Sequence, residues 1–379
     1  MHIMIVIHSL GGGGAERVAV DLAAAWLKLG YQVSVVTQSD SSTDVYTVPA
    51  GVTRYELRTA EETGGGWKGA WANWRRVNKL RRLFKRVRPD CVIGMMSTSS
   101  ILAIMAARNL PIRVIATEHT HPPSQKLSDF WLKMRRWAYP RATAVVALTT
   151  DTGVWIQEHL PGSRVVVIPN AVRWPVPDTE PTLMPPPRNG RFRLLAVGRL
   201  HPVKGFDVLI EAFRLLARYF PLWDLVIVGD GPERQALQQQ IDAANLQDRI
   251  QLVGRVGTIS AWYEQSDLYV LSSRTEGLSN TLLEAMASGL APVAFDCETG
   301  PREIIRPDLD GVLVLPVAEP EALAAHLSDL MAHPLKRVAL SRRAVDVRDR
   351  FSAARVLAMW EQLLHKAEPA SPKNKQAAP

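Results

Sequence analysis

Two glutamates, Glu276 and Glu284, flank a seven-residue segment that begins Gly-Leu-Ser-Asn and follows an apolar run typical of a strand. Ser279 and Asn280 are favourable residues for capping a helix start, so we expect Glu276 in a loop and Glu284 about one turn into a helix. The backbone N–H groups of residues 277–281 would then favour an anion, and carboxylates accept hydrogen bonds from paired hydroxyl groups. The segment therefore offers two hydroxyl-binding groups around a phosphate site, although the spacing alone also fits two solvated acids.

A pair of cations, Arg199 and Lys204, follows a predicted strand in the same half of the chain. Arg199 lies where the strand ends, and Lys204 lies beside Gly205 at the predicted start of the next helix. Arginine offers a planar fork and lysine a point charge, so both side chains can reach one diphosphate from this edge. Two solvated charges beside a loop are the alternative interpretation.

Four consecutive glycines, Gly11 to Gly14, lie between the predicted first strand and the first helix. Glycines allow the backbone to approach a ligand closely, and a helix start offers N–H groups to an anion. The dinucleotide fingerprint does not fit, because its last glycine would fall on Glu16, and no Lys-Ser or Lys-Thr follows as in a P-loop. A phosphate contact from Gly13 and Gly14 and a flexible turn without a ligand fit this pattern equally well.

The cysteines and acidic pairs do not form a metal-binding pattern. Cys91 and Cys297 lie in separate apolar runs and are predicted to be buried, and no Cys/His cluster has zinc spacing. Asp308 and Asp310 form an acidic triplet with the leucine between them, but this triplet precedes a Gly-led strand, so we expect a surface turn. We expect neither a metal ion nor a cofactor.

The elements that must position these residues alternate between short apolar runs and helical patterns. Runs such as Leu225-Val226-Ile227-Val228 are apolar on both faces, as in the central strands of a covered parallel sheet. This alternation predicts two doubly wound α/β domains with ligand sites at the carboxyl ends of their strands. The predicted strands are residues 2–8, 32–38, 90–96, 113–119, 144–149 and 164–170, then 193–200, 224–231, 250–256, 267–273, 292–297 and 311–317.

The predicted domain boundaries follow from composition. Residues 173–192 are rich in proline and predict a stiff, extended linker between an N-terminal domain at 1–172 and a C-terminal domain at 193–350. A C-terminal helix is expected at residues 351–366, with the option of crossing back to the N-terminal domain. Residues 367–379 have low complexity and are expected to be disordered.

Overall composition limits the class of protein. The 379 residues are 47% hydrophobic and 22% charged, which is ordinary for a globular protein of two domains. The apolar runs are too short to span a membrane, and the first residues look like a strand rather than a signal peptide. The net charge of +8 favours an anionic partner.

One segment, residues 67–89, concentrates this charge, because it contains nine Lys or Arg residues and no acid. Its apolar side chains recur at steps of three or four and predict an amphipathic helix that either lies on a membrane surface or covers the sheet with a solvated basic face. A second stretch, residues 126–141, adds Phe130, Trp131, Trp137 and Tyr139. The candidate membrane or acceptor residues are Trp67, Trp71, Trp74, Arg75, Arg76, Lys79 and Arg82.

Taken together, these segments resemble retaining glycosyltransferase family 4. The stretch EGLSNTLLEAMASG from Glu276 is similar to the EX7E motif of that family. The segments GGAER from Gly13, VGRL from Val197 and KG at Lys204 match its other landmarks in order, and the resemblance runs from about residue 1 to about residue 364. It implies the GT-B fold, in which two Rossmann-like domains face each other across a cleft.

The resemblance also implies roles at the matching positions. Arg199 and Lys204 would hold the donor diphosphate, Glu284 would bind ribose hydroxyls and Glu276 would face the transferred sugar. His119, at the end of a predicted strand, would bond the sugar or the diphosphate, with His121 a weaker candidate. The remaining donor-binding residues that it implies are Gly13, Gly14, Arg255, Val256, Gly277, Leu278, Ser279, Asn280 and Thr281.

The function implied is the retaining transfer of a hexose or N-acetylhexosamine from a nucleotide diphosphate sugar to a glycan. Among such enzymes the sequence most resembles bacterial N-acetylgalactosamine transferases that extend lipid-linked oligosaccharides in polysaccharide or glycoprotein glycan assembly. We therefore expect a UDP-sugar donor (UDP-GalNAc, UDP-GlcNAc or UDP-Gal), a polyprenyl-diphosphate-linked acceptor and no metal requirement. The expected location is the inner face of the cytoplasmic membrane, held peripherally by anionic lipid.

Two other functions remain open from the sequence. A nucleotide-sugar epimerase of the same fold would not need the paired glutamates. A basic nucleic-acid-binding protein would give no role to the predicted phosphate sites and paired glutamates. The chain contains no known nucleic-acid-binding pattern, so we expect no nucleic acid partner.

Overall fold

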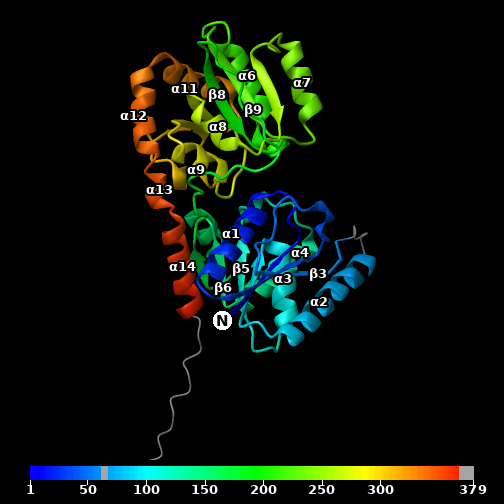
Figure 1. Cartoon of the computed structure of the whole chain (residues 1–379). Helices are drawn as coiled ribbons and strands as arrows, with labels where there is room; N and C mark the ends of the chain where they lie inside the picture. The colour runs from blue at the N-terminus through cyan, green and yellow to red at the C-terminus, as the bar shows by residue number, and fades with distance from the viewer. Residues whose placement is uncertain (61–66, 367–379) are drawn as a thin grey trace, which may run out of the picture. The chain divides into compact units, whose positions relative to one another are not determined.

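The structure is a computed structural model that describes residues 1–60 and 67–366. The tail predicted to be disordered, residues 367–379, lies outside the described residues. The chain divides into two compact units (Figure 1), one formed by residues 1–169 together with the chain from Ala354 onward, and the other by Asn170–Ala353. The predicted linker, residues 173–192, falls within the second unit, and each unit is described by itself below.

The first unit contains a parallel sheet in the order β3-β2-β1-β4-β5-β6-β7. β1 is buried along its whole length, as expected of an apolar strand in the middle of a covered sheet. The order reverses between β1 and β4, and ligands of open α/β sheets bind at such a reversal, beyond the carboxyl ends of the strands. The strands are β1 (His2–Ile7), β2 (Gln32–Thr37), β3 (Thr53–Glu56), β4 (Cys91–Met95), β5 (Arg113–Glu118), β6 (Ala144–Ala147) and β7 (Val165–Val167).

Helices pack on this sheet through apolar faces. Leu80 and Phe84 of α2, Ile101 of α3 and Ile156 of α5 join one buried cluster with the strands. The helices are α1 (Gly14–Lys28), α2 (Trp67–Val87), α3 (Ser97–Ala107), α4 (Asp129–Ala138), α5 (Thr150–His159) and α14 (Ala353–Lys366), with short 3-10 turns η1 (Ser41–Thr43), η2 (Pro122–Ser124) and η3 (Tyr139–Arg141).

The second unit contains a parallel sheet in the order β10-β9-β8-β11-β12-β13, which reverses between β8 and β11. Its strands are β8 (Phe192–Val197), β9 (Trp223–Val228), β10 (Ile250–Gly254), β11 (Leu268–Leu271), β12 (Pro292–Phe295) and β13 (Val312–Val314). Its helices are η4 (Pro202–Lys204), α6 (Phe206–Leu216), α7 (Arg234–Ala243), α8 (Ile259–Glu264), α9 (Asn280–Ala287), α10 (Pro301–Ile304), α11 (Pro320–Ala332), α12 (Pro334–Ala344) and α13 (Val347–Arg350).

The predicted fold class, two doubly wound α/β domains, is confirmed, and each predicted strand has a counterpart. The sequence missed β3, whose four residues, Thr-Arg-Tyr-Glu, carry two charges and no run of apolar side chains. β3 is an edge strand of the described sheet and pairs with β2, so it needs no apolar side chains on both faces.

Residues 173–191 of the predicted Pro-rich linker contain no helix or strand, Phe192 already begins β8, and the segment packs on the rest of the second unit. Thr179 donates its backbone N–H to the Gly257 carbonyl over 3.0 Å, and Gly257 donates to Pro181 over 2.7 Å. The Trp262 indole nitrogen donates to the Leu183 carbonyl over 2.8 Å. These bonds hold residues 179–183 against the loop that follows β10 and against α8.

The C-terminal helix α14 packs on the first unit. The rings of Trp26 in α1 and Trp360 in α14 meet edge to face with centroids 5.7 Å apart. Arg113 of β5 donates a hydrogen bond to the Leu364 carbonyl over 2.5 Å. Across the described ranges, 1–60 and 67–366, no helix is long and apolar enough to cross a membrane.

Candidate functional site

The loops after β8 and β11 meet at the carboxyl edge of the second sheet, because these two strands are neighbours. The Arg274 backbone N–H donates to the Val203 carbonyl over 2.8 Å, and the Ser272 hydroxyl donates to the Lys204 carbonyl over 2.9 Å. Gly205 has a φ of 62°, and a Cβ there would lie 2.1 Å from the Ser272 carbonyl oxygen, so only glycine permits this approach.

This contact brings together Lys204 and Glu276, two residues predicted from the sequence. The Lys204 ammonium donates to Oε1 of Glu276 over 2.6 Å, and the Ser273 hydroxyl donates to the same oxygen over 2.6 Å. The Lys204 side chain is 24% exposed and that of Glu276 only 9% exposed. A partly accessible cation is thus held beside an oriented carboxylate.

Arg274 holds the same two loops together and was missed by the sequence analysis. Its guanidinium forms two hydrogen bonds with Asp207 in the first turn of α6, over 2.8 and 2.6 Å, and donates to the Pro202 carbonyl over 2.6 Å. Hydrogen bonds from Arg274 lower the pKa of Asp207, so this pair stays charged. Neither residue belongs to the predicted motifs, and only the fold makes them neighbours.

Helix α9 begins as predicted at Asn280, with Ser279 as its cap. The Ser279 hydroxyl accepts from the Leu282 N–H over 3.4 Å, and residues 277–281 surround this helix start. Thr281 accepts a hydrogen bond from Tyr269 over 2.9 Å. Glu284 is 2% exposed, and its Oε2 accepts a hydrogen bond from Tyr263 over 3.2 Å, so a ligand must compete with a protein hydroxyl for that oxygen.

Three other predicted donor residues lie at ends of strands in this unit. Arg199 is exposed just beyond β8, and its side chain has no hydrogen bond or ion pair within the described part of the chain. Arg255 is exposed and Val256 is partly exposed beyond β10, after Gly254, whose φ is 88°. Arg199 therefore forms no hydrogen bond or ion pair with Lys204 or Glu276 in the described part of the chain, and its charge is available to an anion at this edge.

In the first unit, Gly13 caps α1, and Gly14 is the first residue of the helix. The Glu16 carboxylate folds back over Gly13, because a Cβ at Gly13 would lie 2.1 Å from one of its oxygens. A glutamate at this position of the first turn commonly reaches back to a helix start. The predicted anion site thus already has a carboxylate beside it.

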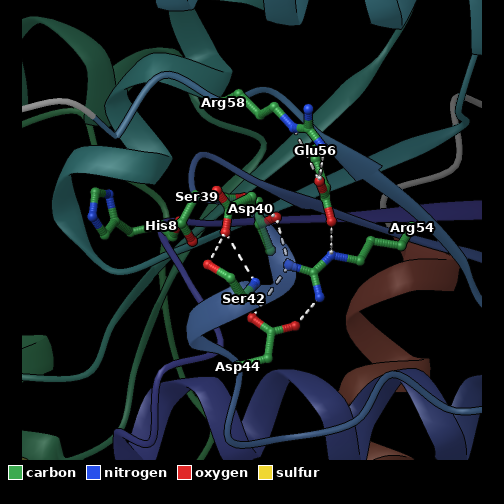
Figure 2. Close-up of polar contacts among 9 residues, drawn as sticks. His8, Ser39, Asp40, Ser42, Asp44, Arg54, Glu56 and Arg58 are labelled. Atoms are coloured by element: carbon green, nitrogen blue, oxygen red, sulfur yellow. Dashed lines mark hydrogen bonds and ion pairs between the residues drawn. The ribbon is translucent and has the colours of Figure 1, made fainter.

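A network of charged residues supports the loop beside these glycines (Figure 2). Arg54 of β3 bonds Asp44 and lies 3.6 Å from Glu56, which also pairs with Arg58 over 3.2 Å. The Val45 backbone N–H, in the same loop, donates to the Leu10 carbonyl over 2.9 Å. The missed edge strand β3 therefore helps to shape the glycine-rich turn.

His119 follows β5 at the carboxyl edge of the first sheet. Its Nε2 lies 3.0 Å from the Thr117 hydroxyl, which donates to the Gly94 carbonyl over 3.0 Å. Burial lowers the pKa of His119 to about 4, so the ring is neutral at pH 7. His121 is buried, and its Nδ1 lies 3.1 Å from the Thr152 hydroxyl, which suits a structural role.

Glu118, which precedes His119, is fully surrounded by protein. The Ser97 hydroxyl and the Gln125 amide each donate to it over 2.8 Å, and the Tyr139 hydroxyl also bonds it. Burial raises the pKa of Glu118. The network anchors both ends of the loop between His119 and Gln125.

Helix α2 has two different halves. Leu80 and Phe84 are fully buried against the first unit, as the sheet-covering interpretation requires. Trp71 is 54% exposed and Trp74 is 62% exposed, and the Arg75 guanidinium lies 4.7 Å from the centre of the Trp71 ring. One half of the predicted apolar stripe thus packs on the core while two tryptophans face outward.

Two predicted surface residues of α2 donate to backbone carbonyls instead. Arg76 is 8% exposed and donates to the Thr59 carbonyl over 3.0 Å, and Lys79 donates to the Leu57 carbonyl over 2.9 Å. Both satisfy backbone oxygens after β3, so we exclude them from the membrane or acceptor surface. Arg82 is exposed, and the side chain of Trp67 lies outside the described residues.

The second aromatic stretch needs a similar correction. Phe130 is 45% exposed on α4, but Tyr139 is fully buried and bonds Glu118, because its hydroxyl completes that network. Trp131 and Trp137 are partly buried against the core. Phe130, at the start of α4, is therefore the most exposed aromatic side chain of this stretch.

The acidic triplet is also more buried than predicted. Asp308 lies in a turn with a φ of 61°, but Asp310 is fully buried and pairs with Arg306 over 2.6 Å and Arg350 over 3.3 Å. Among the described residues, no group of three or more His, Cys, Asp or Glu side chains is arranged to hold a metal ion. Both cysteines are buried and free, as predicted.

Comparison with known proteins covers both units. Residues 12–173 match the family described as Glycosyltransferase Family 4, and residues 185–346 match Glycosyl transferases group 1. An uncharacterized glycosyltransferase of Haemophilus influenzae is 27% identical, with 93% of this chain and 96% of the relative covered. The Campylobacter jejuni enzyme GalNAc-alpha-(1->4)-GalNAc-alpha-(1->3)-diNAcBac-PP-undecaprenol alpha-1,4-N-acetyl-D-galactosaminyltransferase is 25% identical, with 83% and 84% covered.

Solved structures share the fold at low sequence identity. Sucrose-phosphate synthase from Thermosynechococcus elongatus is similar with a TM-score of 0.83 and 17% identity, over 96% of this chain and 98% of that one. HepE from Anabaena in complex with UDP has a TM-score of 0.78 and 20% identity, over 97% and 99%. With a family 4 domain followed by a group 1 domain in the two-domain GT-B fold, the chain belongs to the glycosyltransferases.

Proposed function

We propose that this glycosyltransferase moves a hexose or N-acetylhexosamine from a UDP-sugar to a glycan carried on a polyprenyl diphosphate, with retention of configuration at the sugar. The observation that carries the proposal is the pairing of Lys204 with Glu276 at the start of α9. A cation for phosphate, a carboxylate for hydroxyls and the N–H groups of a helix start lie within one loop pair, and a sugar diphosphate contains the matching groups.

In the proposed reaction, the bond between the anomeric carbon and the UDP oxygen breaks as an acceptor hydroxyl forms a new bond on the same face. The acceptor proton passes to the departing phosphate. Lys204 and Arg199 stabilise the negative charge that grows on the diphosphate. Because these two cations supply that charge stabilisation, we propose that no metal ion is needed.

His119 is proposed to bind a sugar hydroxyl rather than the diphosphate. The Thr117 hydroxyl has one proton, and its 3.0 Å contact with the Gly94 carbonyl requires that proton, so the 3.0 Å contact with His119 requires Nε2–H as the donor. The neutral ring then presents Nδ1 as an acceptor only. An acceptor attracts a hydroxyl and repels a phosphate oxygen.

The choice of donor and acceptor is supported by proteins that this chain resembles. HepE from Anabaena is described in complex with UDP, and the Campylobacter jejuni relative is named for a substrate linked to PP-undecaprenol. The exposed Trp71, Trp74 and Arg75 fit an anionic membrane surface, where such an acceptor resides. We accordingly propose that the enzyme is peripheral on the inner face of the cytoplasmic membrane.

The test is a panel of UDP- and GDP-sugars with polyprenyl-diphosphate-linked acceptors, with product followed by mass spectrometry. We expect transfer from a UDP-sugar, unchanged after chelation with EDTA, and an α-linked product from an α-linked donor. The variants K204A and E276A should lose at least about a hundredfold in kcat/KM, because each removes a group placed at the charged centre.

Folding of both variants is checked by circular dichroism, and the matched control is R214A, an exposed Arg of α6 that pairs with Glu211 in the same helix. Near-normal turnover by K204A or E276A would rule out the site assignment. Full loss of activity with EDTA would rule out the metal-independent mechanism, and inversion in the product would rule out retention.

A further inference from the structure

The connection between β4 and α3 is a single residue, Met96. β4 ends at Met95 and α3 begins at Ser97, so the chain must reverse from strand to helix at one position. Met96 does so with φ 67° and ψ 163°, a backbone conformation adopted almost exclusively by glycine. This conformation costs free energy in a residue that has a Cβ.

The surrounding structure enforces the conformation. A Cβ at Gly94 would lie 2.4 Å from the Ser100 Cα, so α3 packs directly on β4 and leaves no room for a longer turn. The Met96 N–H donates to the Thr117 hydroxyl over 3.4 Å, and its carbonyl accepts from the Ser100 N–H over 3.0 Å. Position 94 has a glycine because a side chain there would clash with α3. Position 96 has a methionine although its backbone conformation favours glycine.

The strained residue presents a large apolar side chain to its surroundings. Met96 is 39% exposed at the carboxyl end of β4, beside the reversal of strand order between β1 and β4. The Thr117 hydroxyl that accepts from its backbone also bonds the His119 ring. Met96 and His119 therefore share one support at the edge where ligands of this fold bind.

Most of the other non-glycine residues with positive φ differ from Met96. Asn109, Asn189, Asn245 and Asp308 carry a side chain that tolerates this region, and Arg88 directly follows α2, where chains commonly adopt it. Arg58 and Ala318 also have positive φ, but they lie in loops, and neither joins a strand directly to the first residue of a helix. Neither explanation applies to Met96, which starts a helix. Strain retained without a local reason points to a use for the side chain.

We infer that Met96 forms the apolar wall of a saccharide subsite in the first unit. Its side chain would pack against the C–H face of the sugar ring that donates a hydroxyl hydrogen bond to His119. A pyranose has a hydroxyl rim and an apolar face, and an acceptor nitrogen and a thioether from two residues that contact one hydroxyl can match both. Met96 would then determine which sugar is accepted. This inference rests on the proposed function, because it assumes that His119 binds a sugar.

The test compares M96G with M96L, using the donor and acceptor pair that the wild type turns over. Glycine relieves the backbone and removes the side chain, so M96G should unfold at the same or a higher temperature while kcat/KM falls by at least about tenfold, as expected from losing one apolar contact. M96L keeps an apolar side chain and should stay within about threefold of wild type. Calorimetry and steady-state kinetics give both readouts.

R88G is the matched control, since it also replaces a positive-φ residue, but next to the amino end of β4. It should leave kcat/KM unchanged, and the affinity of M96G for UDP alone should equal that of wild type. Wild-type kcat/KM in M96G, or a tenfold loss in R88G, would overturn the inference. A wild type inactive with the whole UDP-sugar panel, or a fully active H119A, would instead overturn the proposed function on which it rests.

Discussion

At the residue scale, the fold gives several single side chains a chemistry that their types alone do not specify. Lys204 and Glu276 are 72 positions apart and share a hydrogen bond of 2.6 Å because β8 and β11 are neighbours. Ser273 donates to the same carboxylate oxygen, which orients Glu276 from a second direction. The spacing of motifs suggested both residues, whereas their pairing depends on the strand order.

His119 leads to a prediction about stability and pH. Burial lowers its pKa to about 4 from an ordinary 6.5, so between these values the unfolded chain binds a proton that the folded chain does not. The free energy of unfolding should therefore fall as the pH drops from about 6.5 to about 4. The variant H119Q, which cannot be protonated, should lose less stability over that interval.

Urea unfolding at a series of pH values measures this difference. The control is H159Q, because His159 is an exposed residue at the end of α5 and its replacement also removes one imidazole from the chain. Parallel curves for wild type and H119Q between pH 4 and 6.5 would contradict the prediction.

At the scale of elements, α2 shows how one helix serves two environments. Its second half buries Leu80 and Phe84, and its first half exposes Trp71 and Trp74. Charge is distributed in the same way, because Arg76 and Lys79 satisfy backbone carbonyls while Arg75 lies over an exposed tryptophan ring. A membrane surface made by α2 is therefore narrower than the basic composition suggested.

The exposed half of α2 should bind anionic vesicles. In flotation with vesicles containing about one third phosphatidylglycerol, the double variant W71S/W74S should bind at least about tenfold more weakly than wild type, because two interfacial aromatic side chains are lost. The variant W174S is a matched control, since Trp174 in the second unit is 40% exposed and also stacks with an arginine, Arg348, at 4.0 Å. Equal binding of all three proteins would exclude α2 as the docking surface.

At the scale of the whole molecule, the last helix belongs to the unit formed by the first part of the chain. Trp360 is 4% exposed, and its ring contacts that of Trp26, which is fully buried. Tyr31 donates a hydrogen bond to Glu361 over 2.5 Å, and Arg113 bonds the Leu364 carbonyl. The first unit therefore depends for part of its core on a helix that follows the second unit in the chain.

W360A should destabilise the first unit by about 3 kcal/mol, because it leaves a cavity the size of an indole against Trp26. Hydrogen exchange of amides in β1 and β5 reports on that unit specifically, which matters because two units need not unfold together. M359A is the control on the same helix, since Met359 is 37% exposed and should cost less than about 0.5 kcal/mol. Unchanged protection of β1 and β5 in W360A would show that α14 contributes little.

The sequence by itself determined the fold class and most elements. Apolar runs such as Ile3 to Ile7 are fully buried, and a chain with this alternation of runs and helical patterns can satisfy its backbone only in covered parallel sheets. The start of α9 was also readable, because Ser279 and Asn280 favour a helix start through local hydrogen bonds. Local patterns of this kind act between residues that are close in the chain.

Only the tertiary structure decided which side chains meet. The role of Arg274, the inward direction of Arg76, the burial of Asp310 and the strain at Met96 each depend on a partner supplied by another element. Edge strand β3 was missed for a related reason. Its backbone pairing with β2 holds it in place, and its own sequence has no apolar pattern that would predict a strand. Composition and periodicity report burial and local conformation, whereas a contact between distant residues is determined by strand order and packing, which no local pattern encodes.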